Sequence, residues 1–268
     1  MTRERYTHGH APSVIRAHAT RTVEDSLAYG LPLLLPGTTV LDLGCGPGTI
    51  SAGIARRVAP GRVIAVDTDL YVLHQAQKYA TASGATTIDF AAMDAYRLAL
   101  PDDCVDLAHA HQLLQHVADP VAVLREMARV TRPGGHIAVR DADYAAFAWH
   151  PASPGITRWL SLYRAAAKAN GGEPDAGRHL LAWAHAAGLT DIVSTSSTWT
   201  YPAGERAREW GESWADRILH SALTTQLLDS GAATRADLDG ISAAWLEWSA
   251  SPDAWFMVPH GEILATVH

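Results

Sequence analysis

The sequence predicts a doubly wound α/β fold, in which helices cover both faces of a parallel sheet. Short apolar runs alternate with segments of helical periodicity, and a glycine-rich turn follows the first of these runs. A chain of 268 residues with 48% hydrophobic content can also bury one large core. Because strands that alternate with helices are joined by right-handed crossovers, we expect them to pair in parallel.

The first half of the chain alternates between the two periods. Residues 13–35 place apolar side chains at helical spacing, which predicts one or two amphipathic helices ahead of the sheet. Strands are expected at residues 39–43, 62–67, 86–91, 105–109 and 136–141. Helices are expected at residues 48–58, 69–82 and 119–130.

The second half is less regular. The pattern indicates helices at 155–170 and 178–187, a strand at 191–199, two or three helices within 204–250, and a last strand within 255–268. No linker marks a second independent domain, so we expect three parts of one domain. They are an N-terminal helical cover (1–37), a ligand-binding core (38–142), and helical cap insertions with the last sheet strands (143–268), where the cap lies over the carboxyl edge of the sheet.

Composition excludes several classes of function. A net charge of −7, with no run of Lys or Arg, argues against a nucleic-acid partner. Cys45 and Cys104 lack a CxxC spacing, and the fourteen histidines, His109, His111 and His116 among them, have no acid at ligand spacing, so no metal site is expected. The longest apolar stretch, residues 31–36, is too short to span a bilayer. We expect a cytoplasmic protein without a membrane partner.

The turn in VLDLGCGPGTI (residues 40–50) places bare backbone N–H groups at the carboxyl edge of the sheet. The dinucleotide fingerprint requires G-x-G-x-x-G. Here Gly44 and Gly46 are followed by Gly48, one position early, and Thr49 takes the place of the third glycine. The spacing therefore argues against a dinucleotide, although a nucleotide-dependent oxidoreductase on the same fold stays an alternative.

Two acidic residues near this turn narrow the ligand further. Asp42 would repel a pyrophosphate but would attract a cationic group. Asp67 ends the expected strand at 62–67, 19 positions after Gly48, where a carboxylate can accept hydrogen bonds from both ribose hydroxyls. A cationic nucleoside without phosphate fits these features, and S-adenosylmethionine carries an α-ammonium and a sulfonium on a nucleoside.

These residues also carry a family resemblance. VLDLGCGPGTI, the acid Asp67, the Asp94 in AAMDAYRLALPDDCVD, and LREMARVTRPGGHIAV follow one another at proper spacing over residues 38–142. They resemble the successive motifs of class I S-adenosylmethionine-dependent methyltransferases, in the broad group that includes the ubiquinone/menaquinone-type enzymes. The substrate-side signatures of the quinone-biosynthetic enzymes are not visible, so the resemblance does not imply quinone specificity.

The resemblance implies a Rossmann-like, seven-stranded sheet and a set of residues that bind S-adenosylmethionine. Gly44, Gly46 and Gly48 would line the methionine moiety, and Cys45 would contribute small size and its backbone. The remaining cofactor contacts would be Asp67 with Thr68 at the ribose, Asp94 with Met93 and Ala95 at the adenine, His111 under the methionine amino group, and Asp42 and Tyr6 beside the same moiety.

Methyl transfer from a sulfonium is an in-line displacement, so alignment and desolvation can supply most of the acceleration. A base is needed only where the nucleophile must lose a proton. Tyr6, His8 and His10 could fold over the cofactor, with Tyr6 or His10 at the methionine carboxylate or the substrate, unless this polar N-terminus is disordered. His10 and Tyr144 are the candidate catalytic residues, and aromatic packing is the alternative for Tyr144.

The predicted cap is rich in tryptophan. Most of the nine tryptophans are expected to form its core, and a few could face an apolar pocket for a flat or lipophilic small molecule. The charged residues that could orient such an acceptor, unless they form surface pairs, are Glu173, Asp175, Arg178, Asp216 and Arg217. The function expected is methyl transfer to a small organic acceptor by a protein that could form a homodimer. The alternative in another class is a non-catalytic S-adenosylmethionine-binding module.

Overall fold

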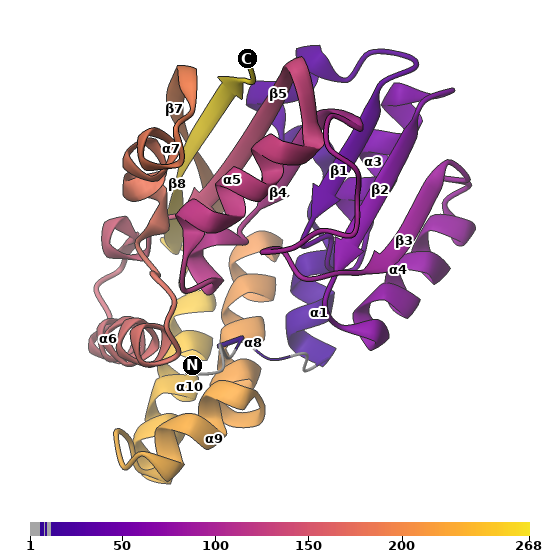
Figure 1. Cartoon of the computed structure of the whole chain (residues 1–268). Helices are drawn as coiled ribbons and strands as arrows, with labels where there is room; N and C mark the ends of the chain where they lie inside the picture. The colour runs from indigo at the N-terminus through magenta and orange to yellow at the C-terminus, as the bar shows by residue number, and fades with distance from the viewer. Residues whose placement is uncertain (1–5, 8, 10–11) are drawn as a thin grey trace.

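An eight-stranded sheet runs through the computed structural model, which describes residues 6–7, 9 and 12–268 (Figure 1). The strand order is β3-β2-β1-β4-β5-β8-β6, and β7 pairs with the other edge of β8. Its parallel strands are β1 (Thr39–Leu43), β2 (Arg62–Asp67), β3 (Ile88–Ala92), β4 (Val105–His111) and β5 (Thr131–Ala142). The bounds of β1 and β2 are those predicted from the sequence, whereas β4 runs two residues further and so includes His111.

The antiparallel side of the sheet adds one short strand to the seven expected. β8 (Trp255–Thr266) pairs along its whole length with β7 (Thr190–Pro202). On its other side, β5 reaches only residues 260–266 of β8, and β6 (Ala148–His150) pairs with residues 255–257. A three-residue strand is too short to show a period in the sequence, so it was not predicted.

Two buried clusters cover the faces of the sheet. One packs under α2 (Val23–Ser26), the 3-10 helix η1 (Ala28–Leu33), α3 (Thr49–Val58) and α4 (Leu70–Ala82). The other packs under α5 (Pro120–Val130) and α7 (Leu180–Ala187), the latter preceded by the 3-10 helix η4 (Ala176–His179). The carboxylates of Asp69 and Asp119 accept hydrogen bonds from backbone N–H groups in the first turns of α4 and α5 and so cap these helices. Each helix therefore begins directly after a predicted strand or turn. These layers give the doubly wound α/β fold expected from the sequence.

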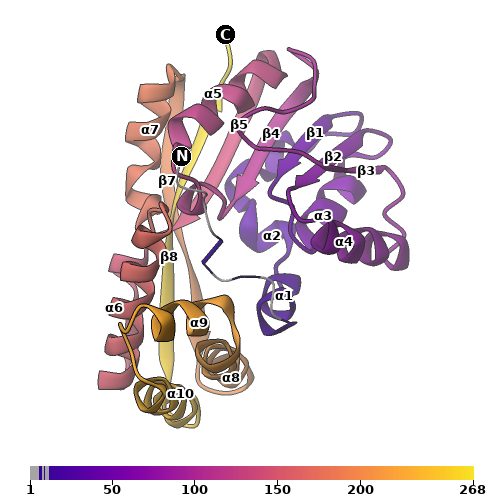
Figure 2. The same ribbon diagram turned by 60° about the horizontal axis from the view of Figure 1, so that its bottom comes forward.

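The remaining helices gather beyond the carboxyl ends of β5 and β7 (Figures 1 and 2). They are α6 (Pro154–Ala169), α8 (Glu205–His220), α9 (Ala222–Asp229) and α10 (Arg235–Ser249). Their shared core contains Trp159, Trp214 and Trp245, with Phe256 of β8. The short helix α1 (Pro12–Ala19) packs against α8 and lies between these helices and α3 in Figure 2. We call α6 and α8–α10 the cap helices.

The two remaining short elements, η2 (Leu114–His116) and η3 (Tyr144–Ala146), follow β4 and β5 at the carboxyl edge. None of the helices in the described residues is long and apolar enough to cross a membrane. His8 and His10, which the sequence offers as contacts over the cofactor, lie outside the described residues.

Candidate active site

The turn from β1 into α3 supplies the floor of a cavity at the carboxyl edge. Gly46 has a φ of +53°, and a Cβ built there would meet no atom within 4 Å, so the turn leaves open space on this side. Gly48 also has a positive φ, of +79°, but its Cβ would lie 2.8 Å from the Cβ of Ala76 on α4. The first glycine borders open space, whereas the second permits close packing between the turn and α4.

This glycine-loop cavity has a volume of about 270 Å³. Eleven of the residues expected to bind the cofactor line it: Tyr6, Asp42, Gly44, Cys45, Gly46, Asp67, Thr68, Met93, Asp94, Ala95 and His111. Gly48 is the exception, because its position is turned toward Ala76.

The two acids near the turn are held differently. Asp67 accepts hydrogen bonds from the backbone N–H groups of Gly46 and Asp69, both at 3.1 Å, so the end of β2 is fixed against the turn. Asp42 is only 2% exposed and lies between the Ser51 hydroxyl, at 2.5 Å, and Nδ1 of His109, at 2.8 Å. Each carboxylate oxygen of Asp42 therefore has a partner within the protein, and Asp42 also lines the cavity.

His111 ends β4 at the wall of the same cavity. Its side chain is buried, and neither ring nitrogen has a hydrogen-bond partner among the described residues. Burial, together with the nearby charges of Arg21 and Arg140, lowers the pKa of His111 well below its usual value. The imidazole is therefore neutral at physiological pH and offers a nitrogen lone pair to a ligand.

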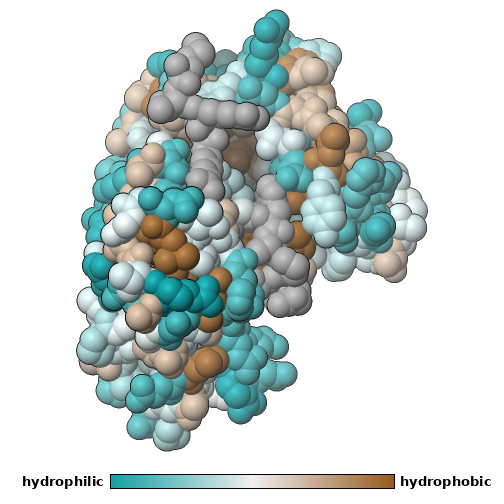
Figure 3. Space-filling model, turned by 90° about the horizontal axis from the view of Figure 1, so that it is seen from below, coloured by the Kyte–Doolittle hydropathy of each residue, from teal (hydrophilic) through white to brown (hydrophobic). Residues whose placement is uncertain are grey.

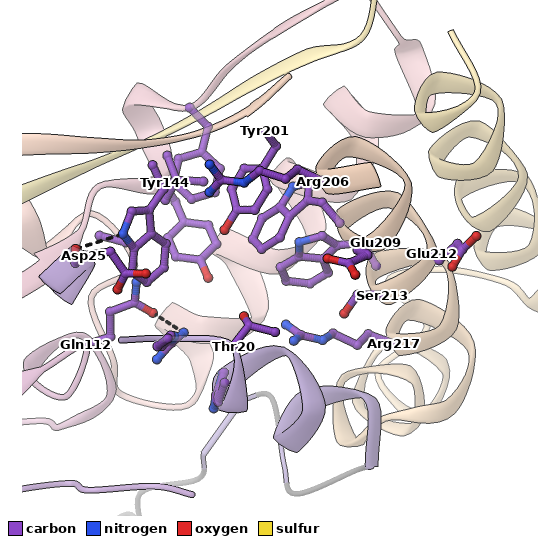
Figure 4. A pocket seen from close by; sticks show the side chains of 18 of the residues that line it. Thr20, Asp25, Gln112, Tyr144, Tyr201, Arg206, Glu209, Glu212, Ser213 and Arg217 are labelled. Atoms are coloured by element: carbon purple, nitrogen blue, oxygen red, sulfur yellow. Dashed lines mark hydrogen bonds between the residues drawn. The ribbon is translucent and has the colours of Figure 1, made fainter. Parts of the chain in front are cut away.

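A second and larger cavity lies between the sheet and the cap helices (Figures 3 and 4). We call it the cap cavity; its volume is about 820 Å³. Its aromatic walls are Tyr144, Phe147, Trp199, Tyr201, Trp210 and Trp214. Seen from below, the molecule is hollowed between its two halves, and both hydrophilic and hydrophobic residues lie on the surrounding surface (Figure 3).

The two cavities share three residues, His18, Arg21 and Gln112. Arg21 donates a hydrogen bond to Oε1 of Gln112 at 2.8 Å, a contact that is drawn in Figure 4. Nε2 of Gln112 lies 2.8 Å from Nε2 of His260, whose Nδ1 is 3.0 Å from the Arg140 guanidinium. Gln112 has a φ of +53°, a conformation that costs a non-glycine residue about 1–2 kcal/mol, so strain is held where the two cavities meet.

Neither tyrosine proposed for the site is set up as a base. Tyr144 stacks between Phe147 and Tyr163, with ring centroids 4.4 Å from each, and Tyr6 lies edge-on to His116 at 4.7 Å. Burial raises the pKa of both tyrosines above the ordinary value, so each keeps its proton at neutral pH. Tyr144 thus packs, as the alternative interpretation has it, and also lines the cap cavity.

Comparison with known proteins decides the family. A model of the methyltransferase-domain family matches residues 41–139. An uncharacterized methyltransferase of Schizosaccharomyces pombe is 31% identical over 97% of this chain and 95% of its own length. The chain belongs to the class I S-adenosylmethionine-dependent methyltransferases. A probable methyltransferase of Aspergillus luteorubrus, ltbC, is 29% identical over 97% of this chain and 96% of its own.

The solved structures agree on the fold of this methyltransferase. The YcgJ protein of Bacillus subtilis matches with a TM-score of 0.57 at 18% identity, over 91% of this chain and 99% of its own. The predicted fold class, enzyme class and methyl donor are confirmed, and the oxidoreductase alternative is set aside. Among the described residues of the methyltransferase, no group of three or more His, Cys, Asp or Glu side chains could hold a metal ion.

Sequence reasoning missed all three residues at the junction, His18, Arg21 and Gln112, and most of the α8 wall. Gln112 follows His111 directly, so its neighbour was the available signal, but its contact with Arg21 spans 91 positions. Of the charged cap residues singled out, Asp216 and Arg217 line the cap cavity. Arg178 pairs with Asp143. Asp175 and Glu173 pair with Arg164 and Lys168.

Proposed function

We propose that this methyltransferase carries the methyl group of S-adenosylmethionine from the glycine-loop cavity to a small organic molecule in the cap cavity. The observation that carries the proposal is the shared wall of His18, Arg21 and Gln112, because a donor and an acceptor must meet across such a boundary for in-line transfer. Whether an oxygen, nitrogen or carbon atom accepts the methyl group is left open by this proposal.

Three features of the glycine-loop cavity suit S-adenosylmethionine. The open space at Gly46 lets the methionine part approach the backbone, and the unprotonated ring nitrogen of His111 can accept a hydrogen bond from the α-ammonium group. Asp67, fixed at the end of β2, is placed to accept bonds from the ribose hydroxyls, with Thr68 beside it. In the same proposal Met93, Asp94 and Ala95 surround the adenine.

The bound cofactor supplies a methyl group that is already activated, so the protein's contribution is alignment and exclusion of water. The aromatic walls of the cap cavity serve both purposes for a flat or lipophilic acceptor. Tyr144 keeps its proton and is assigned to shaping this wall rather than to proton removal. In this proposal residues 1–37 cover the junction, residues 38–142 hold the donor, and residues 143–268 hold the acceptor. A catalytic role for His10 and a homodimer stay predictions.

Calorimetric titration with S-adenosylmethionine and S-adenosylhomocysteine tests the donor site. Asp67→Ala should weaken binding at least about 10-fold, because charge-assisted hydrogen bonds to the ribose contribute about 1.5–3 kcal/mol. Asp89→Ala is the matched control, since Asp89 is an exposed acid on the neighbouring strand β3 that pairs with Arg62. Unchanged affinity in Asp67→Ala would remove Asp67 from the site.

Turnover tests the acceptor side of the proposal. The wild-type protein is incubated with S-adenosylmethionine and a panel of small aromatic alcohols, acids and amines, and release of S-adenosylhomocysteine is measured. Methylation of at least one panel member, lost in Asp67→Ala and kept in Asp89→Ala, is the expected result. Tight binding of the donor with no turnover on any acceptor would favour the non-catalytic binding module.

A further inference from the structure

One face of α8 forms a wall of the cap cavity (Figure 4). Trp210, Ser213, Trp214 and Arg217 line it and follow one another at i, i+3, i+4 and i+7, which places them in a single stripe along the helix. The stripe is continuous over two turns, so a ligand in the cavity would lie along it.

The polar groups of this stripe are mainly hydrogen-bond donors. The hydroxyl of Ser213 and the indole N–H of Trp210 are buried and have no hydrogen-bond partner among the described residues. Arg217 is only 4% exposed, and its guanidinium points into the cavity toward Thr20 in Figure 4. The two donors without a partner, the Ser213 hydroxyl and the Trp210 indole, are costly to bury, which favours a ligand that brings acceptor oxygens.

In the cap cavity the positive charge of Arg217 is buried, whereas the negative charges on α8 lie nearer to solvent. Arg217 is buried against the ring of Trp214, with its guanidinium carbon 5.0 Å from the ring centroid. Burial lowers its pKa to about 10, so it stays charged at neutral pH. Three acids of α8 line the same cavity. Glu209 and Glu212 are exposed, and the Asp216 side chain is 44% exposed and pairs with His220, so solvent screens all three. The effective charge in the buried part of the cavity is therefore positive.

We propose that the acceptor of this methyltransferase is a flat aromatic molecule with an anionic oxygen, either a carboxylate or a phenolate. Arg217 binds the anionic oxygen, and the Ser213 hydroxyl and the Trp210 indole donate hydrogen bonds to the same group. The ring lies against Tyr144 and Trp214, at the aromatic walls. This inference rests on the proposed function, because it names the class of molecule that the cap cavity takes.

The test compares matched pairs of probes on the full chain saturated with S-adenosylhomocysteine, with affinity measured by titration calorimetry. Naphthalene-2-carboxylate is paired with naphthalene-2-carboxamide, and 4-nitrophenolate, at mildly alkaline pH, is paired with 4-nitroanisole. In at least one pair the anion should bind at least about 10-fold more tightly than its neutral partner. The pair that shows the preference distinguishes a carboxylate from a phenolate.

Three variants test which side chain causes the preference for the anionic probe. Arg217→Gln should reduce the preference for the anion to less than about 2-fold. Ser213→Ala should reduce the preference about 3-fold, since a neutral donor contributes less than a charged one. Arg208→Gln is the matched control, because Arg208 lies on the same helix but is exposed and outside the cavity lining. It should leave the preference unchanged.

The outcomes separate this inference from the proposed function. If the protein binds no S-adenosylhomocysteine, the proposed function fails. If it binds S-adenosylhomocysteine but shows no preference for an anion in either pair, or binds no anionic probe at millimolar concentration, the inference is overturned. A preference that persists in Arg217→Gln overturns it as well. Should Arg217→Gln fail to fold, which loss of S-adenosylhomocysteine binding would reveal, an undiminished preference in Ser213→Ala decides against the inference.

Discussion

The glycine-loop cavity is bounded mainly by backbone turns and strand ends, whereas side chains on helices and on β7 bound the cap cavity. The first takes its shape from Gly44, Gly46 and the end of β2 at Asp67. The second takes its shape from rings such as Tyr144 and Trp210. A cavity built from backbone changes little with sequence and suits an invariant ligand. A cavity built from side chains can be altered residue by residue, which suits an acceptor that differs among enzymes of one fold.

The two regions also differ in how the site relates to the core. Near the glycine loop, Gly46 and Asp67 border the cavity without belonging to the aliphatic core, although Ile50 both lines the cavity and belongs to that core. In the cap the same aromatic cluster serves both purposes: Trp214 lines the cavity and packs against Trp159, with ring centroids 4.3 Å apart. Stability and acceptor shape are therefore coupled through one aromatic cluster in the cap, whereas Gly46 and Asp67 border the glycine-loop cavity from outside the core.

The largest expected effect comes from breaking the aromatic cluster. Trp214→Ala should lower the free energy of unfolding by about 3–5 kcal/mol, because a large buried ring is replaced by a void. S-adenosylhomocysteine should still bind to the fraction that remains folded. Urea unfolding and calorimetric titration provide the two measurements. Trp255→Ala is the control, since Trp255 is 38% exposed, and it should lose less than about 1 kcal/mol. Equal losses in the two variants would contradict a core role for Trp214.

The glycines of the turn give the next largest effect and sharpen the contrast within one loop. Gly48→Ala should lose about 2–4 kcal/mol of unfolding free energy, because a positive φ is combined with a 2.8 Å clash at Ala76. Gly46→Ala should lose only about 1–2 kcal/mol, from backbone strain alone, yet should weaken S-adenosylmethionine binding more than Gly48→Ala does. Stability and affinity that change in parallel in the two variants would show that both glycines serve the same purpose.

These contrasts explain how far the sequence could predict the site. The turn and Asp67 are local features, since a switch from period 2 to period 3.6 fixes where β1 and β2 end. The role of Gly48 was not predictable, because Ala76 lies 28 positions away on α4. The helical pattern of residues 204–250 was recognisable, but the rotation that turns Arg217 inward depends on packing of α8 against β7 and α10. Long-range packing, which no local pattern records, determines the acceptor side.

A pH-dependent effect comes from His116, at the wall of the glycine-loop cavity. Burial lowers its pKa from 6.5 to about 3, with a further contribution from Arg21. The unfolded chain therefore binds a proton below about pH 6.5 that the folded protein does not, and stability falls as the pH drops from there toward about 3. The contribution of this histidine is at most about 1.4 kcal/mol per pH unit.

His116→Gln removes this titration, so its unfolding free energy should fall less steeply with acid than that of the wild type. Urea unfolding of the unliganded protein at several pH values between neutral and mildly acidic gives the slopes. His74→Gln, an exposed histidine on α4, should keep the wild-type slope. If the curves of wild type and His116→Gln run parallel, the proton uptake on acid unfolding occurs elsewhere.

The smallest effect is expected from a charge pair that joins η4 to the end of β5. Arg178 of η4 binds both carboxylate oxygens of Asp143, at 2.6 and 2.7 Å, just beyond the end of β5. The Arg178 side chain is 49% exposed, so solvent and salt screen the pair, and Arg178→Gln should lose about 1 kcal/mol or less. Repeating urea unfolding at high salt should remove most of that difference. A loss as large as that of Trp214→Ala would show that this ion pair stabilises the fold as much as the aromatic cluster does.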